Sequence, residues 1–354
     1  MGEGRRRWLV LALWVALIGG AAWALIGLIA RAGGPDAIVA AAGRVDALHW
    51  LVLIPATVAF YGLDWLRFRA LLAILGHRLP LRLGLELAAV SYFVTCLTPT
   101  AELHLPAMVL WLVQRGYPLG AATAAALAKS IYMLLWVCVT GLIGLALHAG
   151  PVVPPSLRVA LAIAFVVPAA LVLTLALAIV MPARMHGACA RALARPSIAG
   201  WRRALITGLD DTVAGLAIIG RSRSSSHVAA HLACLAFIAC YVAIGWLLAH
   251  GVGLTLGPAE AGATFAASLM VAYIAPTPGG AGATESATAF LLDPTLPAAA
   301  TTVALLLRTL CTYAIAPIGL ILVVRQARRM GWTSFRRRLR ERPHPVPVAD
   351  TIEP

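Results

Sequence analysis

Long runs of apolar residues, separated by short segments that contain arginine, make up most of the chain. A helix that crosses the hydrocarbon core of a membrane needs about 20 predominantly apolar residues. The pattern therefore predicts an all-α polytopic membrane protein with six full transmembrane spans, over residues 8–30, 48–65, 119–148, 157–181, 228–250 and 298–324.

Two further apolar runs, 83–97 and 259–275, are short for a full span and end at proline-containing breaks. Each is followed by a second apolar stretch, which carries Glu102 in the first case and Glu285 in the second. We predict that each pair of stretches forms a re-entrant helical hairpin, which enters and leaves the membrane on the same side.

The distribution of arginine supports this topology, because cytoplasmic loops of membrane proteins are enriched in Lys and Arg. With six spans and two hairpins, 23 of the 28 basic residues fall in segments predicted to be cytoplasmic, namely 1–7, 66–82, 114–118, 182–227 and 325–354. Turning one hairpin into a full crossing would invert every later loop. The charge pattern therefore favours both hairpins or neither, with both termini in the cytoplasm.

The two halves of the chain share one plan, in which a short helix, a proline break and a glutamate precede a long span with one basic residue. The matching residues are Gly84, Pro99, Glu102 and Lys129 in the first half, and Gly262, Pro278, Glu285 and Arg308 in the second. In the predicted topology the two hairpins have opposite orientations. Inverted repeats with broken helices near the middle of the bilayer are typical of alternating-access transporters.

The second break is rich in residues that interrupt helices, namely Pro276, Pro278, Gly279, Gly280 and Gly282. Backbone groups that lose their helical partners at membrane depth must be buried in protein or line a polar cavity. A helix that restarts near Ala283 would direct free N–H groups into such a cavity. This arrangement is suited to binding a phosphate or a carboxylate.

Glu285 and Arg308 are the strongest candidate site residues, because ionisable groups within membrane segments usually serve a transport pathway. We expect them to form an ion pair that a lipid phosphate competes with during transport. Two structural alternatives stay open at this stage. Glu285 could serve only as the cap of the helix that follows the break, and the pair could be permanent.

Glu102 and Lys129 would be the corresponding pair in the first half. Lys129 is the only lysine of the chain, and as an alternative its ammonium could reach the cytoplasmic surface along its flexible stem. His104, two residues after Glu102, could help to bind a headgroup, although a lone histidine is more often structural.

Composition supports a lipid-facing protein: 61% of the residues are hydrophobic, 12% are charged and the net charge is +14. A basic balance on so apolar a chain favours anionic lipid headgroups over nucleic acid. The six cysteines form no CxxC pair, and no nucleotide-binding or metal-binding motif is present, so we expect no metal and no cofactor. Residues 1–330 are predicted to form one transmembrane domain with an amphipathic cytoplasmic segment at 183–220, and 331–354 a basic, then proline-rich, disordered tail.

The run from Pro276 to Glu285 and the run from Leu307 to Gly319 resemble the signature of the lysylphosphatidylglycerol synthase transmembrane family. The resemblance implies two re-entrant hairpins around a lipid cavity and the translocation of a polar-headed lipid between leaflets. The first half departs from the family pattern, with Leu105 at the place of an arginine and Ala128 before Lys129. About 30 residues follow the last predicted span, so we do not expect the aminoacyl-transferase domain or lysyl-lipid synthesis.

The expected function is translocation, without enzymatic activity, of an anionic or prenyl-phosphate-linked lipid across a bacterial inner membrane. One alternative is a membrane-embedded glycosyltransferase or lipid-modifying enzyme, for which Asp36, Asp46 and Asp293 are the only acids predicted outside. Another is a scaffold of a lipid or envelope pathway. A second copy of the chain and enzymes of lipid metabolism are the candidate protein partners.

Overall fold

A computed structural model describes residues 3–98, 104–147, 170, 173, 211–275, 277–292 and 295–329, and these residues form helices and connecting turns without any strand. Five helices are long and apolar enough to cross a membrane: Trp14–Arg31, Ala47–Ile74, Leu119–Ile143, Ser225–Gly251 and Pro297–Arg329. They correspond to five of the six predicted spans. The sixth, 157–181, lies outside the described residues except for two isolated positions.

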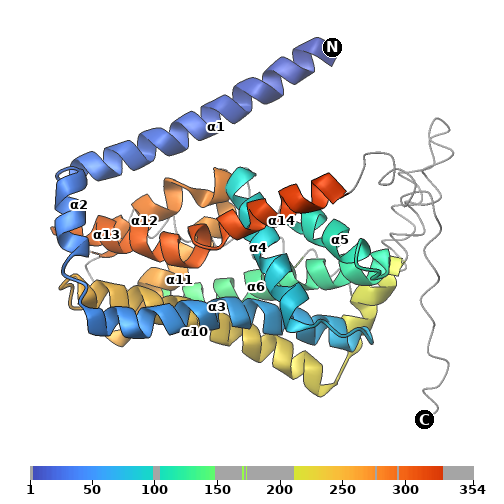
Figure 1. Cartoon of the computed structure of the whole chain (residues 1–354). Helices are drawn as coiled ribbons and strands as arrows, with labels where there is room; N and C mark the ends of the chain where they lie inside the picture. Colours follow the sequence, from blue (N-terminus) through green and yellow to red (C-terminus); the bar gives the residue numbers. More distant parts are fainter. Residues whose placement is uncertain are drawn as a thin grey trace.

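The helices follow one another along the chain as Figure 1 shows. Their bounds are α1 Glu3–Arg31, α2 Pro35–Ala42, α3 Ala47–Ile74, α4 Leu81–Leu97, α5 His104–Val113, α6 Leu119–Leu147, α10 Ser225–Gly251, α11 Pro258–Ile274, α12 Ala283–Leu292, α13 Pro297–Arg308 and α14 Ala316–Arg329. A 3-10 turn, η2 (Pro278–Gly280), lies between α11 and α12. A π-helical turn, η3 (Thr309–Tyr313), follows α13.

Helices α3 and α10 form the most extensive helix pair of the described fold and run antiparallel. Gly251 at the end of α10 lies against Val45 just before α3, and the Cys240 thiol contacts the carbonyl oxygen of Ala56 at 3.4 Å. Phe60 and Phe237 stack with their ring centroids 4.2 Å apart. Both helices carry large apolar side chains that are fully buried, so this pair forms the centre of the hydrophobic core.

The order and lengths of the helices repeat in the two halves. Helices α4 and α5 have 17 and 10 residues, and α11 and α12 have the same lengths. At about 1.5 Å per residue, neither member of a pair reaches across 30 Å of hydrocarbon. Helix α4 packs against α14 of the second half, and α11 packs against α6 of the first. Because α3 and α10 are antiparallel, α4 and α11 begin at opposite ends of the bundle.

The repeat also holds for single residues of the core. Phe237 lies 177 positions after Phe60, and Tyr241 lies 177 positions after Asp64. The first residues of α4 and α11, Leu81 and Pro258, have the same separation. Tyr241 therefore occupies in α10 the place that Asp64 occupies in α3.

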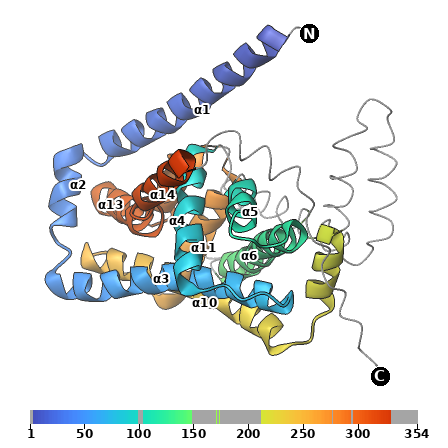
Figure 2. The ribbon, with the colours of Figure 1, turned by 45° about the vertical axis from the view of Figure 1, so that its right-hand side comes forward.

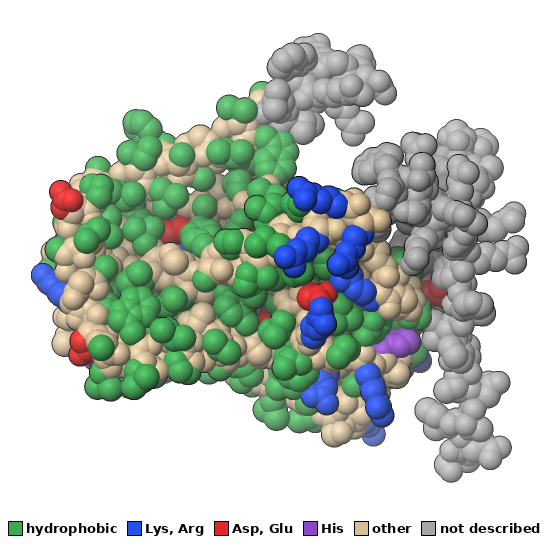
Figure 3. Space-filling view, viewed as in Figure 1, with side chains coloured by type: hydrophobic (Ala, Val, Ile, Leu, Met, Phe, Trp, Pro, Cys, Tyr) green, Lys and Arg blue, Asp and Glu red, His purple; other side chains and the backbone are tan. Residues whose placement is uncertain are grey.

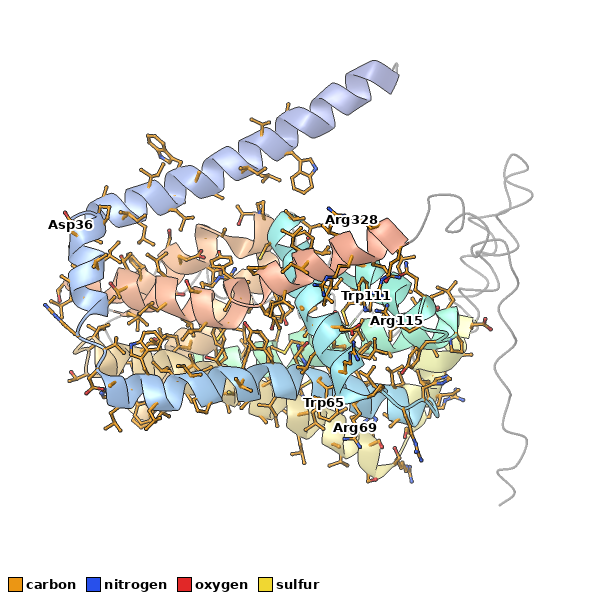
Figure 4. The ribbon with its side chains drawn as sticks, viewed as in Figure 1. Asp36, Trp65, Arg69, Trp111, Arg115 and Arg328 are labelled. Atoms are coloured by element: carbon orange, nitrogen blue, oxygen red, sulfur yellow. The ribbon has the colours of Figure 1, made fainter. Side chains whose placement is uncertain are left out.

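Basic side chains gather at one end of the bundle. Figure 3 shows them on one face, toward the start of α4 and the end of α14, and Figure 4 places Arg115 and Arg328 at that end and Asp36 at the opposite one. The guanidinium of Arg69 lies 5.2 Å from the ring of Trp65, and that of Arg115 lies 4.5 Å from the ring of Trp111. Tryptophan and arginine together are typical of a membrane–water interface.

Helix α1 leaves the rest of the bundle at an angle, as Figures 1 and 2 show. Only 6% of its apolar stretch Trp14–Arg31 is buried, and α1 contacts the bundle mainly beside the second break. There Gly282 lies so close to α1 that a Cβ atom would be 2.8 Å from the carbonyl oxygen of Ala21. In a membrane, most of the apolar surface of α1 would face acyl chains.

The prediction that the second span ends at residue 65 is wrong. Helix α3 continues to Ile74, and Arg67, predicted to lie in a cytoplasmic loop, is 3% exposed. Asp64 and Arg67 near its end suggested a span terminus, but these two side chains are paired inside the bundle. Of the predicted segment 183–220, residues 211–220 are described; they are helical, and Asp211 lies against Gly120 of α6. The predicted tail, 331–354, lies outside the described residues.

The packing of α14 on α4 generates a prediction. A Cβ atom on Gly319 would lie 2.0 Å from the carbonyl oxygen of Ala89, whereas a Cβ atom on Gly62 of α3 would meet nothing within 4 Å. Gly319→Ala should lower the free energy of unfolding by about 1–3 kcal/mol, because backbone must move to make room. Gly62→Ala is the matched control and should be neutral or stabilising. Thermal unfolding in detergent measures both, and equal melting temperatures would contradict the packing.

Candidate functional site

The second helix break has a backbone that only glycine adopts easily. Gly279, Gly280 and Gly282 have φ angles of 59°, 72° and 79°, and Pro278 begins the turn η2. L-residues rarely occupy this left-handed region. Helix α12 begins at Ala283, as predicted. Pro276 lies outside the described residues.

The second break contacts the end of α4 at Gly279. Its N–H donates to the carbonyl oxygen of Thr98, just after the end of α4, at 3.3 Å. A Cβ atom at Gly279 would lie 3.4 Å from the Cα atom of Cys96, so the two backbones are in van der Waals contact. The interrupted helices therefore end side by side inside the bundle, where each leaves polar backbone groups.

Glu285 is completely buried in the first turn of α12 and has three donors. The N–H of Gly282 donates to its Oε2 at 2.7 Å. The Tyr313 hydroxyl and the Nε of Arg308 donate to its Oε1 at 2.8 and 3.3 Å. Glu285 thus serves as a helix cap and as an ion-pair partner at the same time, and the predicted Glu285–Arg308 pair is present.

Arg308 holds the break together through its other nitrogens. Its Nη1 donates to the Thr312 hydroxyl at 3.0 Å, and its Nη2 donates to the carbonyl oxygen of Gly279. We call Glu285, Arg308, Thr312, Tyr313 and the Gly279 carbonyl the Arg308 cluster. The guanidinium is 5% exposed and joins α12, η2 and η3 into one unit.

The π-helical turn η3 sets the positions of Thr312 and Tyr313. Pro317, four residues after Tyr313, lacks the N–H that would continue a regular helix, and the ladder is interrupted here. The Tyr61 hydroxyl of α3 donates to the carbonyl oxygen of Leu310 at 2.6 Å, inside this turn. The turn is therefore stabilised from the opposite half of the protein.

A second group of buried charges lies in the first half, and the sequence predicts only its lysine, Lys129, as a site residue. The carboxylate of Asp64 accepts from Arg67 through Oδ1, at 3.0 Å from Nε and with a second bond from Nη2, and from the Nζ of Lys129 through Oδ2 at 3.0 Å. The three side chains are 3–5% exposed. We call them the Asp64 cluster.

Both clusters line one cavity of about 80 Å³, here called the central cavity. At roughly 10–15 Å³ for each water, this volume holds several water molecules or a small polar group. Its charged side chains are Arg67, Lys129, Arg308 and Asp64, and its hydroxyls come from Ser91, Tyr92, Thr95, Ser130, Tyr241, Tyr273 and Thr312. Even with Glu285 counted, the two clusters carry three positive and two negative charges.

The central cavity has more hydrogen-bond donors than acceptors. An arginine has five N–H donors and a lysine has three, and neither has an acceptor. The Nη1 of Arg67 contacts the thioether sulfur of Met133, a weak acceptor, at 2.8 Å. The buried Tyr241 hydroxyl also lines this cavity. Such a cavity fits an anion with several acceptor oxygens, such as a phosphate.

The structure brings most of the predicted site residues together. Glu285, Arg308 and Gly279 belong to the Arg308 cluster, and Lys129 and the buried His104 line the same cavity. The alternative that Lys129 reaches the cytoplasmic surface is wrong, because its ammonium is buried against Asp64. Glu102 lies outside the described residues, so the Glu102–Lys129 pair stays a prediction.

Two of the three acids considered for an enzymatic alternative, Asp36 and Asp46, lie at the starts of helices. Asp46 caps α3 and accepts from the backbone N–H of His49 at 2.9 Å and from its imidazole at 2.7 Å. These bonds hold the pKa of Asp46 below its usual value. A general acid needs a raised pKa instead. Asp36 lies in the first turn of α2, and Asp293 lies outside the described residues.

His227 and His231 lie one turn apart on α10, with their Nε2 atoms 3.2 Å apart. The indole of Trp136 donates to Nδ1 of His231 at 3.0 Å, and the Tyr132 hydroxyl contacts Nδ1 of His227 at 3.3 Å. All four ring nitrogens thus have hydrogen-bond contacts, and the two at Nδ1 join α10 to α6. The described residues contain no cluster of three or more metal-ligating side chains.

These features were compared with known protein families. A family model described as the lysylphosphatidylglycerol synthase TM region matches residues 9–319. The chain belongs to this family. The match covers both helix breaks, the Arg308 cluster and the Asp64 cluster, and it makes the chain a multi-pass membrane protein of a lipid-related family. A comparison with curated proteins finds no match.

The buried Glu285–Arg308 pair generates a second prediction. Glu285→Gln leaves a buried guanidinium without its counter-ion and should destabilise the protein by about 3–5 kcal/mol. Adding Arg308→Gln removes the uncompensated charge, so the double variant should be more stable than the sum of the single effects, with a coupling energy of about 0.5–3 kcal/mol. Thermal unfolding of the two single variants and the double variant measures the coupling, and additive effects would contradict the pair.

Proposed function

We propose that this protein moves a lipid with an anionic, phosphate-bearing headgroup between the two leaflets of a bacterial inner membrane. The headgroup passes through the central cavity while the acyl chains remain in the hydrocarbon outside. No covalent bond is made or broken in this process, so the protein acts as a transporter and not as an enzyme. The family assignment supports a lipid-related role.

The observation that carries the proposal is the set of three cations around one cavity between two interrupted helices. Charged groups at membrane depth are costly and are kept where they serve a substrate or ion pathway. The cations come from α3, α6 and α13, and they are buried rather than directed to solvent. Stability alone does not require this arrangement, because apolar side chains of similar volume usually fill such a core at no loss.

The proposed cycle begins with Arg308 bound to Glu285. An entering phosphate competes for the guanidinium, which forms paired hydrogen bonds with phosphate oxygens as readily as with a carboxylate. Glu285 keeps the Gly282 N–H and the Tyr313 hydroxyl as donors when Arg308 turns away. The exchange therefore leaves no buried carboxylate without a partner. An ion gradient or a downhill lipid gradient supplies the driving force.

The topology of the proposal is six full spans and two re-entrant hairpins, α4 with α5 and α11 with α12. The basic end of the bundle faces the cytoplasm, in agreement with the preference of arginine for that side. The N-terminal end of α1 and the C-terminal end of α14 both lie toward this end. Since α4 and α11 begin at opposite ends, the two hairpins open to opposite leaflets, and their meeting point at Gly279 separates the two openings.

A reconstituted transport assay tests the proposal. Arg308→Gln should slow the transfer of fluorescent phosphatidylglycerol between the leaflets of proteoliposomes by about 10- to 100-fold, the value of one or two hydrogen bonds to a charged group. Arg308→Lys keeps the charge without the planar fork and should retain part of the rate. Arg82→Gln is the matched control, because the Arg82 side chain is 93% exposed in a pair with Glu86.

Transfer at the wild-type rate by Arg308→Gln protein that is folded and inserted would contradict the proposal. The other functions considered above give different results. A membrane-embedded glycosyltransferase would form product from a prenyl-phosphate sugar donor in the purified state. A scaffold would keep its full biological function with both Glu285 and Arg308 replaced.

A further inference from the structure

The two charged clusters of the central cavity hold their carboxylates in different ways. Glu285 has two donors besides its arginine, and one of them is the backbone N–H at its own helix start. Asp64 accepts hydrogen bonds only from Arg67 and Lys129 among the described residues. The carboxylate of Asp64 is therefore held by the two cations alone, one on each oxygen.

Each of the two cations of the Asp64 cluster also has contacts that do not involve Asp64. The Arg67 guanidinium lies 4.0 Å from the ring centroid of Phe237, and its Nη1 contacts Met133. The Lys129 ammonium lies 5.6 Å from the ring centroid of Phe68. Contacts of cations with aromatic faces are attractive, and more so when water is excluded. The cations would remain in place if the carboxylate between them turned away.

We propose that the Asp64 cluster is a second binding site for the phosphate of a lipid headgroup, in which Asp64 occupies the place of the phosphate while the site is empty. This inference rests on the proposed function and adds a second site to it. A phosphate has several oxygens and can contact Arg67 with one and Lys129 with another, as the two oxygens of Asp64 do. When Asp64 turns away from Arg67 and Lys129, the phosphate replaces its negative charge beside the same two cations.

The internal repeat explains why the two sites differ. The counterpart of Asp64 in the second half is Tyr241, which lines the same cavity as Arg308 and carries a neutral hydroxyl in place of a carboxylate. A neutral donor at that position adds to phosphate binding at the Arg308 cluster. A carboxylate at the matching position of the Asp64 cluster competes with the phosphate. The headgroup therefore binds in turn to two sites. At the Arg308 cluster α10 supplies no competing acid, and at the Asp64 cluster Asp64 displaces the headgroup.

Removing the competing charge tests the inference. Asp64→Asn should bind short-chain phosphatidylglycerol in detergent about tenfold more tightly than the wild type, and inorganic phosphate likewise, because both cations become available. The same variant should transfer fluorescent phosphatidylglycerol between leaflets more slowly, since release from the site is impaired. Calorimetry measures the two affinities, and the proteoliposome assay measures transfer.

Two further variants complete the design. Adding Lys129→Gln to Asp64→Asn should cancel the gain in affinity, which assigns the gain to this cluster. Glu86→Gln is the matched control, because Glu86 also holds two cations, Arg82 and Arg115, but lies at the basic end outside the cavity. It should leave both affinities unchanged.

Several outcomes would overturn the inference. One is an unchanged or lower affinity of Asp64→Asn for phosphatidylglycerol, and another is a gain in affinity that persists when Lys129→Gln is added. A third is a gain in affinity for inorganic phosphate without one for phosphatidylglycerol, which would assign the site to free phosphate. If Asp64→Asn does not fold, Lys129→Gln and Arg67→Gln in the wild-type background take its place. Each should weaken phosphatidylglycerol binding about tenfold, and unchanged binding in both would overturn the inference.

The failure of this inference is distinguishable from that of the proposed function. If Arg308→Gln abolishes transfer while the Asp64 and Lys129 variants bind phosphatidylglycerol like the wild type, the Arg308 site alone carries transport. If Arg308→Gln also transfers lipid at the wild-type rate, the proposed function fails as well.

Discussion

The cost of keeping charge and open backbone away from water governs this structure. An unpaired polar group in hydrocarbon costs several kcal/mol, so each interrupted helix must find partners inside the protein. Here the carboxylate of Glu285 and the guanidinium of Arg308 satisfy polar groups of the second break, and the N–H of Gly279 joins this break to Thr98 at the end of α4.

The antiparallel arrangement of α3 and α10 determines where the two pairs of short helices lie. It orients the two halves in opposite directions, so that the short helix pairs begin at opposite ends and terminate at one central cavity. A site between two such pairs is accessible in turn from either side if one pair moves relative to the other. In such a movement the charged side chains of the cavity stay beside the short helix pairs, so the protein needs no long polar channel.

The sequence predicted the five spans that the structure describes, the second break and the restart of the helix at Ala283, because these depend on local composition and on proline and glycine. It also predicted the Glu285–Arg308 pair. It did not predict the Asp64 cluster, since the partners of Asp64 lie on the same helix and 65 residues away on α6. The i, i+3 spacing of Asp64 and Arg67 was the available local signal. Charges near the end of an apolar run suggest a span terminus, and only tertiary packing shows them to be buried.

The most direct test of the central claim is the reactivity of a cysteine placed in the cavity. Ser91 lines it from α4 and is 5% exposed, so Ser91→Cys places a thiol in the cavity with a change of one atom, and the chain without native cysteines is the reference. The account predicts that an anionic, water-soluble thiosulfonate labels this cysteine during lipid transfer, faster than a cationic reagent of similar size, and that phosphatidylglycerol slows the labelling. Labelling that is absent, or faster with the cationic reagent, would contradict a wet, positively charged cavity at the meeting point of the two breaks.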